Sequence, residues 1–261
     1  MSAAPDPAKI FCNAAEEGRR RLGQSLLELA ATGFIAGFTI VLGIVAFGIA
    51  RAVLEPVIGE AAKLGSAMAF AVGLVLLIVQ RAELFSENFF DPIAAVFEDQ
   101  RGGLAGPVAR LWSLTLIFNL LGGTLLALLV TVEHVLPSGA TDALAKVAEE
   151  LVARPIRASF VSAVIGGALV ALLSYALQGA HSVTARIVMA FFAGFLLAVG
   201  PFDHVIVTAL HVFIGLLVDA RVTPVQLAEL AGIATLGNLV GGVGLVAFSH
   251  AAQAKGSNRA G

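Results

Sequence analysis

The chain alternates between long apolar stretches and short polar segments. Six apolar runs stand out, and each is close to the ~20 residues that an α-helix needs to cross a bilayer. The pattern therefore predicts a chain that crosses a membrane six times as helices. The runs cover approximately residues 27–50, 64–97, 108–132, 156–177, 187–218 and 227–248.

Two of the six runs are interrupted. The second breaks after residue 79 and resumes at residue 92, and the fifth contains the segment G-P-F-D-H at residues 200–204. Backbone groups cannot stay unpaired in lipid, so each break must face protein or a water-filled cavity. Ionisable side chains at that depth are costly and indicate function. Broken spans in corresponding halves of a chain point to a transport site near the middle of the membrane.

A short repeat relates the two halves. The segment N-L-L-G-G begins at Asn119 in the third run, and N-L-V-G-G begins at Asn238 in the sixth. Three spans per half is an odd number, so the halves must run in opposite directions across the membrane. The paired glycines allow close approach of helices. The predicted fold is an all-α integral membrane protein of two inverted three-helix repeats, in which the second and fifth helices are broken.

Two further helices are predicted outside the spans. Residues 8–22 form an amphipathic pattern with a strongly charged face, which is typical of a helix at the membrane interface. Residues 141–152 carry opposite charges four positions apart and predict a short surface helix. The expected organisation is an N-terminal cytoplasmic or interfacial helix over 1–26, a six-span channel domain over 27–250 and a C-terminal cytoplasmic tail over 251–261.

Composition supports the membrane assignment. The 261 residues are 58% hydrophobic and 13% charged, with a mean hydropathy of +0.93, whereas soluble domains carry roughly 25% charged residues. Of the 16 Lys and Arg, nine fall on the side of the two termini and six on the other, with Arg81 placed in the membrane. This bias favours cytoplasmic termini. The first 22 residues are too charged for a signal peptide, so the first span is expected to be retained.

The sequence offers no enzyme site. Acidic and basic residues number 18 and 16, which gives no indication of a nucleic-acid partner. Cys12 is the only cysteine, so neither an internal disulfide nor a thiolate metal cluster can form. The hydrolase, zinc-protease and P-loop motifs are missing from the sequence. We therefore expect neither catalysis nor a cofactor or metal.

The first break contains four charges and one hydroxyl. Arg81 lies near Glu83, Glu87 and Asp91, and this grouping predicts a buried ion-pair network that fixes the shape of the loop. Ser86 differs, because its hydroxyl can both donate and accept a hydrogen bond to a passing solute. Its neighbours Leu84 and Phe85 are expected to form an apolar constriction.

His204 is the candidate in the second break. Histidine is the side chain whose charge changes near neutral pH, and a break at membrane depth favours function over a packed core histidine. Asp203 precedes it, but adjacent residues do not face each other in a helix. His211 lies two turns further along the same face. Packing and a vestibule position are both open for His211.

These residues carry a resemblance to a known family. The segment Glu83-Leu84-Phe85-Ser86 resembles the D/E-L-F-T loop of the formate/nitrite transporter family, and its continuation L-F-S-E-N resembles one branch of that family. The segment Phe202-Asp203-His204 resembles the F-E-H of the same family, and the two N-x-x-G-G segments resemble its third and sixth spans. The resemblance implies a homopentameric bacterial inner-membrane protein with an aquaporin-like protomer and one pore per protomer.

The resemblance also implies roles for individual residues. Ser86 falls on the loop threonine and His204 on the central histidine of the translocation site. Apolar constrictions are implied at two levels, one formed by Phe70 and Leu74 and the other by Leu84, Phe85 and Leu197. The remaining loop residues are expected to support the site: Arg81, Glu83, Glu87, Asn88, Phe202 and Asp203. The chain departs from the family at Pro155, flanked by Arg154 and Arg157, where a vestibule lysine is usual, and at Ala171, where a pore-facing asparagine is usual.

The predicted function is a membrane channel or transporter for small monovalent anions of weak acids, similar to formate or nitrite. The anion is expected to move with a proton through the central histidine, so the partners are the solute, protons, the lipid bilayer and further copies of the chain. One alternative is a channel for neutral solutes such as water, ammonia or a small alcohol. The other is a transport-inactive structural or sensory member of the family.

Overall fold

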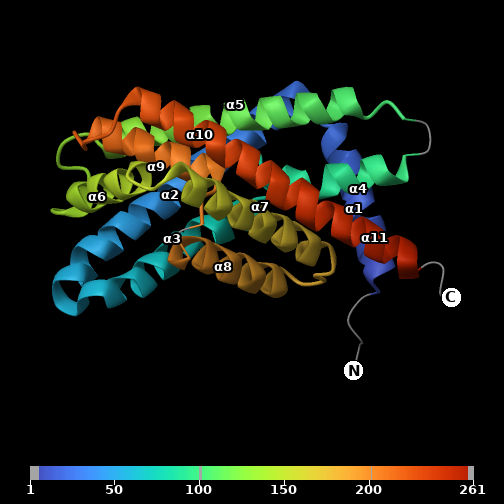
Figure 1. Ribbon diagram of the computed structural model, residues 1–261, viewed down its shortest axis with the longest axis horizontal. Helices are drawn as coiled ribbons and strands as arrows, with labels where there is room; N and C mark the ends of the chain where they lie inside the picture. The colour runs from blue at the N-terminus through green and yellow to red at the C-terminus, as the bar shows by residue number, and fades with distance from the viewer. Residues whose placement is uncertain (1–5, 100–101, 201, 258–261) are drawn as a thin grey trace.

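The computed structural model describes residues 6–99, 102–200 and 202–257, and every regular element within these ranges is helical (Figure 1). Parts of three predicted features lie outside the described residues. They are the two tails at residues 1–5 and 258–261, Arg101 of the positive-charge bias, and Pro201 of the second break. The helices are α1 Pro7–Leu22, α2 Leu26–Ile58, α3 Ala62–Val79, α4 Asp91–Glu98, α5 Ala105–Val130, α6 Ala140–Val152, α7 Ile156–Gln178, α8 Val183–Val199, α9 Val205–Leu217, α10 Pro224–Leu239 and α11 Phe248–Ser257, with the short turns η1 Gly59–Ala61 and η2 Glu87–Phe89 and the π-helical segment η3 Val240–Ala247.

The helices follow the predicted spans, including both interruptions. The second predicted span is α3 and α4 with a loop between them, and the fifth is α8 and α9 on either side of the second break. Within the described residues, four stretches are long and apolar enough to cross a membrane, namely 26–79, 105–130, 156–178 and 224–256. The all-α membrane fold is therefore confirmed, and α8 and α9 are shorter apolar helices because the break divides their span.

The first predicted span was too short. We expected it to end at residue 50, but α2 continues to Ile58. The continuation is charged, and Arg51 makes ion pairs with Glu55 at 3.0 Å and with Glu150 of α6 at 2.9 Å. Because Glu150 is 99 residues away, the apolar pattern could not reveal that these charges stabilise the helix.

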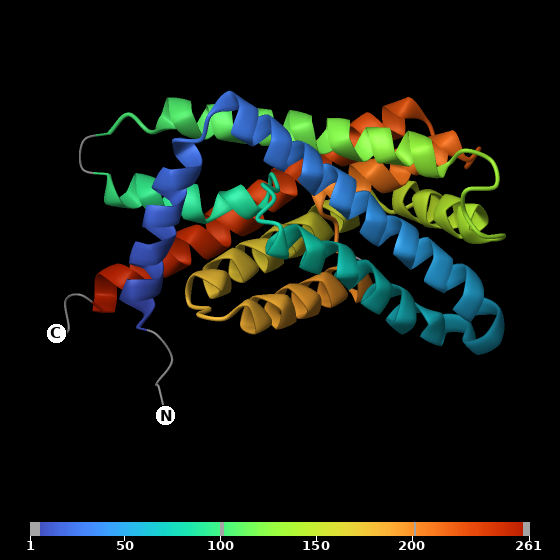
Figure 2. The same ribbon diagram turned by 180° about the vertical axis from the view of Figure 1, so that it is seen from behind.

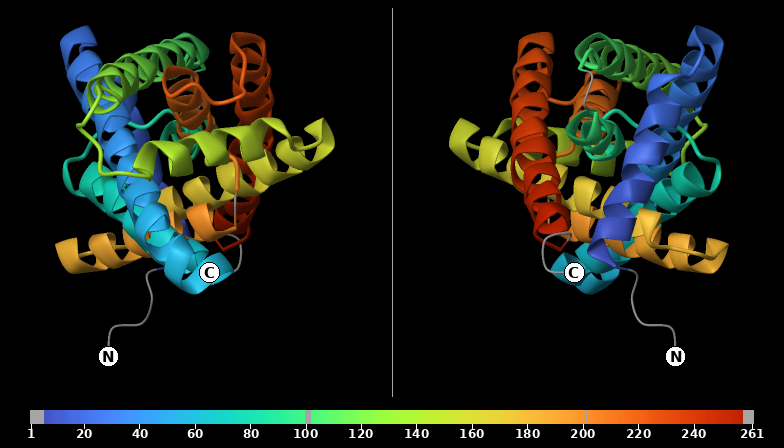
Figure 3. Two further views of the ribbon diagram at one scale, coloured as in Figure 1. Left: turned by 90° about the vertical axis from the view of Figure 1, so that its left-hand side faces the viewer. Right: turned by 90° about the vertical axis from the view of Figure 1, so that its right-hand side faces the viewer.

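The two halves repeat one another in space. In the first half, a side chain at Gly122 of α5 would collide with the backbone carbonyl of Phe34 on α2. In the second half, a side chain at Gly241 of η3 would collide with the carbonyl of Val164 on α7. The same backbone-to-backbone approach is thus made twice, as the paired glycines predicted. Seen along the long axis in Figure 3, α9 lies among α2, α5 and α10, which it contacts.

The two ends of the molecule differ. At one end α1 lies across α4 and α11, as seen in Figure 2. At the opposite end the turn between α2 and α3 lies near α6, which packs on α2 and α9 (Figure 1). The interruptions between α3 and α4 and between α8 and α9 lie between these ends, and they position the candidate site.

A glycine substitution tests the helix contact. Gly241→Ala should lower the free energy of unfolding by about 1–3 kcal/mol, because the new methyl group must displace the Val164 carbonyl. Gly244, on the same π-helical segment, faces open space in the described protomer, so Gly244→Ala is the matched control. Thermal unfolding in detergent measures both variants. An equal loss in the two would contradict the assigned contact.

Candidate functional site

Asn119 holds the first break in shape. Its side-chain oxygen accepts a hydrogen bond from the Phe85 backbone N–H at 2.9 Å. Its amide nitrogen donates to the carbonyls of Gly33 at 2.8 Å and Glu83 at 2.9 Å. The side chain is completely buried. It satisfies two backbone groups of the interrupted segment, at Glu83 and Phe85, and ties that segment to the Gly33 carbonyl of α2.

Asn238 does the same for the second break. Its side-chain oxygen accepts from the Val205 N–H at 2.9 Å, and its nitrogen donates to the carbonyls of Ala163 at 2.7 Å and Asp203 at 2.9 Å. We interpreted Asn119 and Asn238 only as markers of the repeat, and so we missed this role. A buried amide in an apolar span must find partners, and that requirement was a signal that the sequence contained.

Removal of this amide should loosen the second break. Asn238→Leu leaves the Val205 N–H and the Asp203 carbonyl without their partner. Each unpaired buried group costs about 1–3 kcal/mol, so we expect destabilisation of about 2 kcal/mol or more. Asn13→Leu is the control, because Asn13 makes a single bond, to the Gln178 carbonyl at 3.1 Å, at a half-buried position. Hydrogen exchange at the Val205 amide should accelerate only in the Asn238 variant, and unchanged exchange there would contradict the clamp.

Ser86 and His204 meet at the centre of the molecule. Both side chains are at most 1% exposed, and the Ser86 hydroxyl is hydrogen-bonded to His204 Nε2. His204 also precedes α9 as its N-cap residue, where Nδ1 accepts the Val207 N–H at 3.4 Å. Since Nδ1 accepts, the neutral ring carries its proton on Nε2 and donates it to the Ser86 oxygen.

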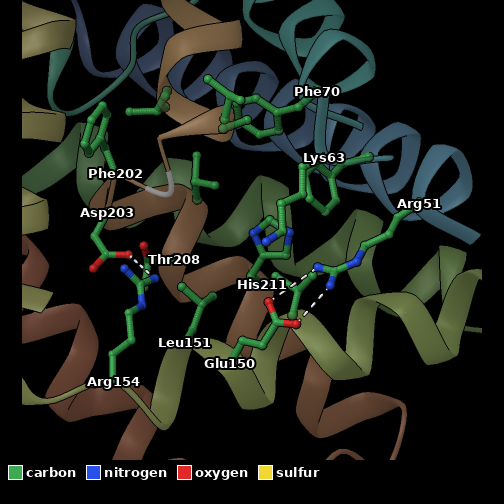
Figure 4. A pocket seen from close by; sticks show the side chains of 16 residues that line it. Arg51, Lys63, Phe70, Glu150, Leu151, Arg154, Phe202, Asp203, Thr208 and His211 are labelled. Atoms are coloured by element: carbon green, nitrogen blue, oxygen red, sulfur yellow. Dashed lines mark hydrogen bonds and ion pairs between the residues drawn. The ribbon is translucent and has the colours of Figure 1, made fainter. Parts of the chain in front are cut away.

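A wide cavity of about 380 Å³ opens beside His204, and Figure 4 shows it from close by. Its body is largely apolar, and two ion pairs lie in its wall: Arg51 with Glu150 at 2.9 Å and Arg154 with Asp203 at 2.8 Å. Its lining also includes Phe47, Lys63, Phe70, Leu151, Leu197, Phe202, Val207, Thr208 and His211. His211 is thus a cavity residue, one of the two positions that we left open for it.

A narrow cavity of about 70 Å³ lies on the other side of the Ser86 loop, beneath α1. Its lining is charged and includes Glu17, Arg20, Arg21, Arg81, Glu83, Glu87 and Arg186. At Glu17 burial raises the pKa, but the hydrogen bond from Arg20 and the charge of Arg21 outweigh it, so the pKa lies below its ordinary value. Sequence neighbours of His204, Asp203 and Val207, line the wide cavity, and neighbours of Ser86, Glu83 and Glu87, line the narrow one.

The predicted ion-pair network exists, but Arg81 is not its cation. Arg21 of α1 approaches Glu87 at 2.8 Å, Glu83 at 3.4 Å and Asp91 at 3.5 Å, and it donates to the Asn88 side chain at 2.9 Å. All five side chains are buried. The network thus joins the N-terminal helix to the first break.

The prediction for Arg81 was wrong for a local reason. The chain turns at this residue with φ +54°, and the guanidinium extends outward with 70% of its side chain exposed, 3.9 Å from Glu17. An exposed charge avoids the cost of desolvation. Arg21 was missed because we read its charge as solvent-facing. Its spacing from Phe11 and Gly18 places it on the buried face of α1, so periodicity could have found it.

The constriction candidates are all buried in one apolar cluster, with exposures of 1–4%: Phe70, Leu74, Leu84, Phe85 and Leu197. Leu197 and Phe70 both line the wide cavity, although we had assigned them to two different constrictions. Ala171 does not line either cavity. It is buried in a cluster with Phe11 and Phe90. Arg154 reaches the wide cavity whereas Arg157 is exposed.

An all-helical membrane protein in which two opposed halves bring broken spans to a shared centre belongs to the class of channels and transporters with an aquaporin-like protomer. A family profile described as "Formate/nitrite transporter" matches residues 8–252. The chain belongs to the formate/nitrite transporter family, as its motifs predicted.

The chain is also similar to a curated protein and to solved structures. The "Inner membrane protein YfdC" of Escherichia coli (strain K12) is 26% identical over 243 residues, which cover 91% of this chain and 76% of that protein. Among solved structures, an "FNT family ion channel" matches with a TM-score of 0.80 at 20% identity, over 92% of this chain and 97% of the other. A "Pentameric formate channel with formate bound" matches with a TM-score of 0.68 at 16% identity, over 90% and 96%.

Proposed function

We propose that the protein conducts small monovalent anions of weak acids, similar to formate or nitrite, and that each anion crosses with a proton supplied near His204. The observation that carries the proposal is the contact between Ser86 and His204. The two side chains come from opposite halves and are buried, and their sequence neighbours line the wide and the narrow cavity. The protein is proposed to be a transport protein and not an enzyme.

The surrounding apolar residues explain why a proton is needed. Phe70 and Leu197 on the wide side, together with Leu74, Leu84 and Phe85, form a dry barrier. A bare anion is expensive there, whereas the neutral acid is far less so. The His204 Nε2–H and the Ser86 hydroxyl can hydrogen-bond the anion before it is neutralised.

The supporting residues have separate roles in this proposal. Glu83, Glu87 and Asn88 hold the first break through Arg21. Asp203 fixes the second break through Arg154, and Phe202 lines the wide cavity beside it. Arg81 has no part in the loop network and is proposed only as a charge at the mouth of the narrow cavity.

The placement and assembly of the protein are also proposed. The printed name of a structural relative describes a pentamer, and we infer a homopentamer for this chain. We assign it to the bacterial cytoplasmic membrane, with both termini in the cytoplasm. The proposed parts are the N-terminal helix over 1–26, the channel domain over 27–250 and the tail over 251–261.

Reconstituted vesicles test the proposal. Uptake of formate and nitrite should increase as the proton gradient toward the vesicle interior is raised, and swelling in glycerol or ammonium should match that of empty vesicles. Swelling in neutral solutes without weak-acid uptake would favour the neutral-solute channel. Absence of both activities, in protein that elutes as a single oligomer, would favour a transport-inactive member of the family.

A further inference from the structure

Helix α9 presents a row of polar side chains toward the wide cavity. His204 stands at its N-terminal end, and Thr208 and His211 follow at helical spacing on the same face. Thr208 and His211 both line the cavity. His211 is seven residues from His204, or about 10.5 Å along the helix axis. A second imidazole therefore lies two turns from the central one, in the wall of the wide cavity.

The ring of His211 has one nitrogen in use and one available. The residue is 6% exposed, and its ring packs edge-on against Phe47 with centroids 6.0 Å apart. One ring nitrogen hydrogen-bonds the backbone of Val207. Among the described residues, Nε2 is buried and has no hydrogen-bond partner. A buried polar atom without a partner is costly, so a cavity-facing nitrogen of this kind is suited to bind a molecule that enters.

The hydrogen bond to Val207 decides what that nitrogen can bind. A backbone carbonyl only accepts, so the ring must donate its proton to Val207, and Nε2 is left as an acceptor in the neutral ring. His204 has the opposite arrangement, because its Nε2 donates to Ser86. An acceptor repels a carboxylate and binds an O–H group. The matching ligand class is therefore an undissociated small weak acid.

The charged groups around His211 are largely paired with one another. From α2, Arg51 binds Glu55 at 3.0 Å and Glu150 of α6 at 2.9 Å. Arg154 binds Asp203 of the second break at 2.8 Å, and Lys63 of α3 pairs with Glu60. Each cation of the cavity wall thus has an acid beside it. Arg51 still opposes a positive charge on the imidazole, so an imidazolium at His211 needs the anion to stay beside it.

We propose that His211 is a second solute-binding group, which accepts the acid proton of an undissociated weak acid in the wide cavity. In the transfer the acid O–H bond breaks, the proton joins Nε2, and the resulting anion stays paired with the imidazolium. The same exchange in reverse returns the neutral acid. This inference rests on the proposed transport function, which routes the solute through the wide cavity to His204.

The first test is binding, and it does not need transport. The purified oligomer, labelled with ¹⁵N-histidine and held in lipid nanodiscs, is titrated with formate over a pH series. We expect the Nε2 resonance of His211, assigned by its loss in His211→Gln, to shift on addition of formate at acid pH, where the undissociated acid is present. A resonance that formate leaves unmoved at every pH would overturn the inference, even if the vesicles transport.

The second test is transport in three variants. His211→Leu should slow weak-acid uptake about tenfold, as expected for loss of one good hydrogen bond, and should weaken its dependence on the pH of the wide-cavity side. His211→Gln retains an acceptor oxygen and should recover part of the rate without the pH dependence. His181→Leu alters an exposed histidine away from both cavities and should match wild type.

The outcomes separate the two proposals. If wild-type vesicles transport and His211→Leu retains both rate and pH dependence, the further inference fails while the proposed function stands. If wild-type vesicles do not transport weak acids, the proposed function fails, and the resonance titration alone decides whether His211 binds them. Elution of each variant as the wild-type oligomer excludes misfolding as the cause.

Discussion

Replacement of His204 by alanine should abolish the proton dependence of weak-acid uptake and slow uptake roughly 10- to 100-fold. The estimate follows from the loss of one hydrogen bond to a charged group, worth about 1.5–3 kcal/mol, since each 1.4 kcal/mol is a factor of ten in rate. The substitution also removes the side chain that caps α9, which costs about 1 kcal/mol of stability. Stopped-flow uptake in vesicles across a pH series measures the effect.

His204→Asn separates the two losses. Asparagine is among the preferred N-cap residues and can hydrogen-bond the Ser86 hydroxyl, but it cannot change charge near neutral pH. We expect this variant to be as stable as wild type and to lose the proton dependence of uptake. If both the alanine and the asparagine variants keep pH-dependent uptake, His204 has no part in the mechanism.

Loss of Arg21 should have the largest effect on stability. Arg21→Met removes the buried cation that faces Glu83, Glu87 and Asp91. A broken buried ion pair leaves uncompensated charge and typically costs about 3–5 kcal/mol, so α1 should detach from the first break. The thermal unfolding midpoint and the rate of proteolysis within α1 report this change.

A neighbouring arginine provides the control for that experiment. Arg19 lies on the same helix, but its side chain is 48% exposed and pairs with Glu98 at 3.4 Å. Exposed pairs contribute about 0–1 kcal/mol, so Arg19→Met should behave almost as wild type. Equal stability of the two variants would show that the buried carboxylates do not depend on Arg21.

The spans and their interruptions could be predicted because both follow from local composition. A bilayer requires long apolar helices, and it tolerates a break only where the backbone is satisfied by protein. Helix ends were harder to predict when long-range ion pairs set them. Arg51 shows this, because its acidic partner Glu150 lies on a surface helix far along the chain.

The candidate site was partly predictable for the same reason. Breaks in opposed halves had to converge, and the structure places Ser86 and His204 in contact. Proximity in sequence favoured Arg81, whereas the periodicity of α1 places Arg21 on its buried face. Which carboxylates Arg21 meets could not be predicted, because that depends on how α1 docks against the first break. The wide cavity and its ion pairs likewise arise only when α2, α6 and α9 assemble.

The clamps formed by Asn119 and Asn238 have an evolutionary consequence. Each holds the amide just after one particular residue, Leu84 in the first half and His204 in the second. Those two residues therefore occupy corresponding places in two copies of the same backbone arrangement, which the asparagine side chains hold in shape. After such a duplication, the side chain at this place can stay apolar in one copy and become an ionisable ring in the other. Natural selection can thus change the chemistry of the pore while the backbone fold stays the same.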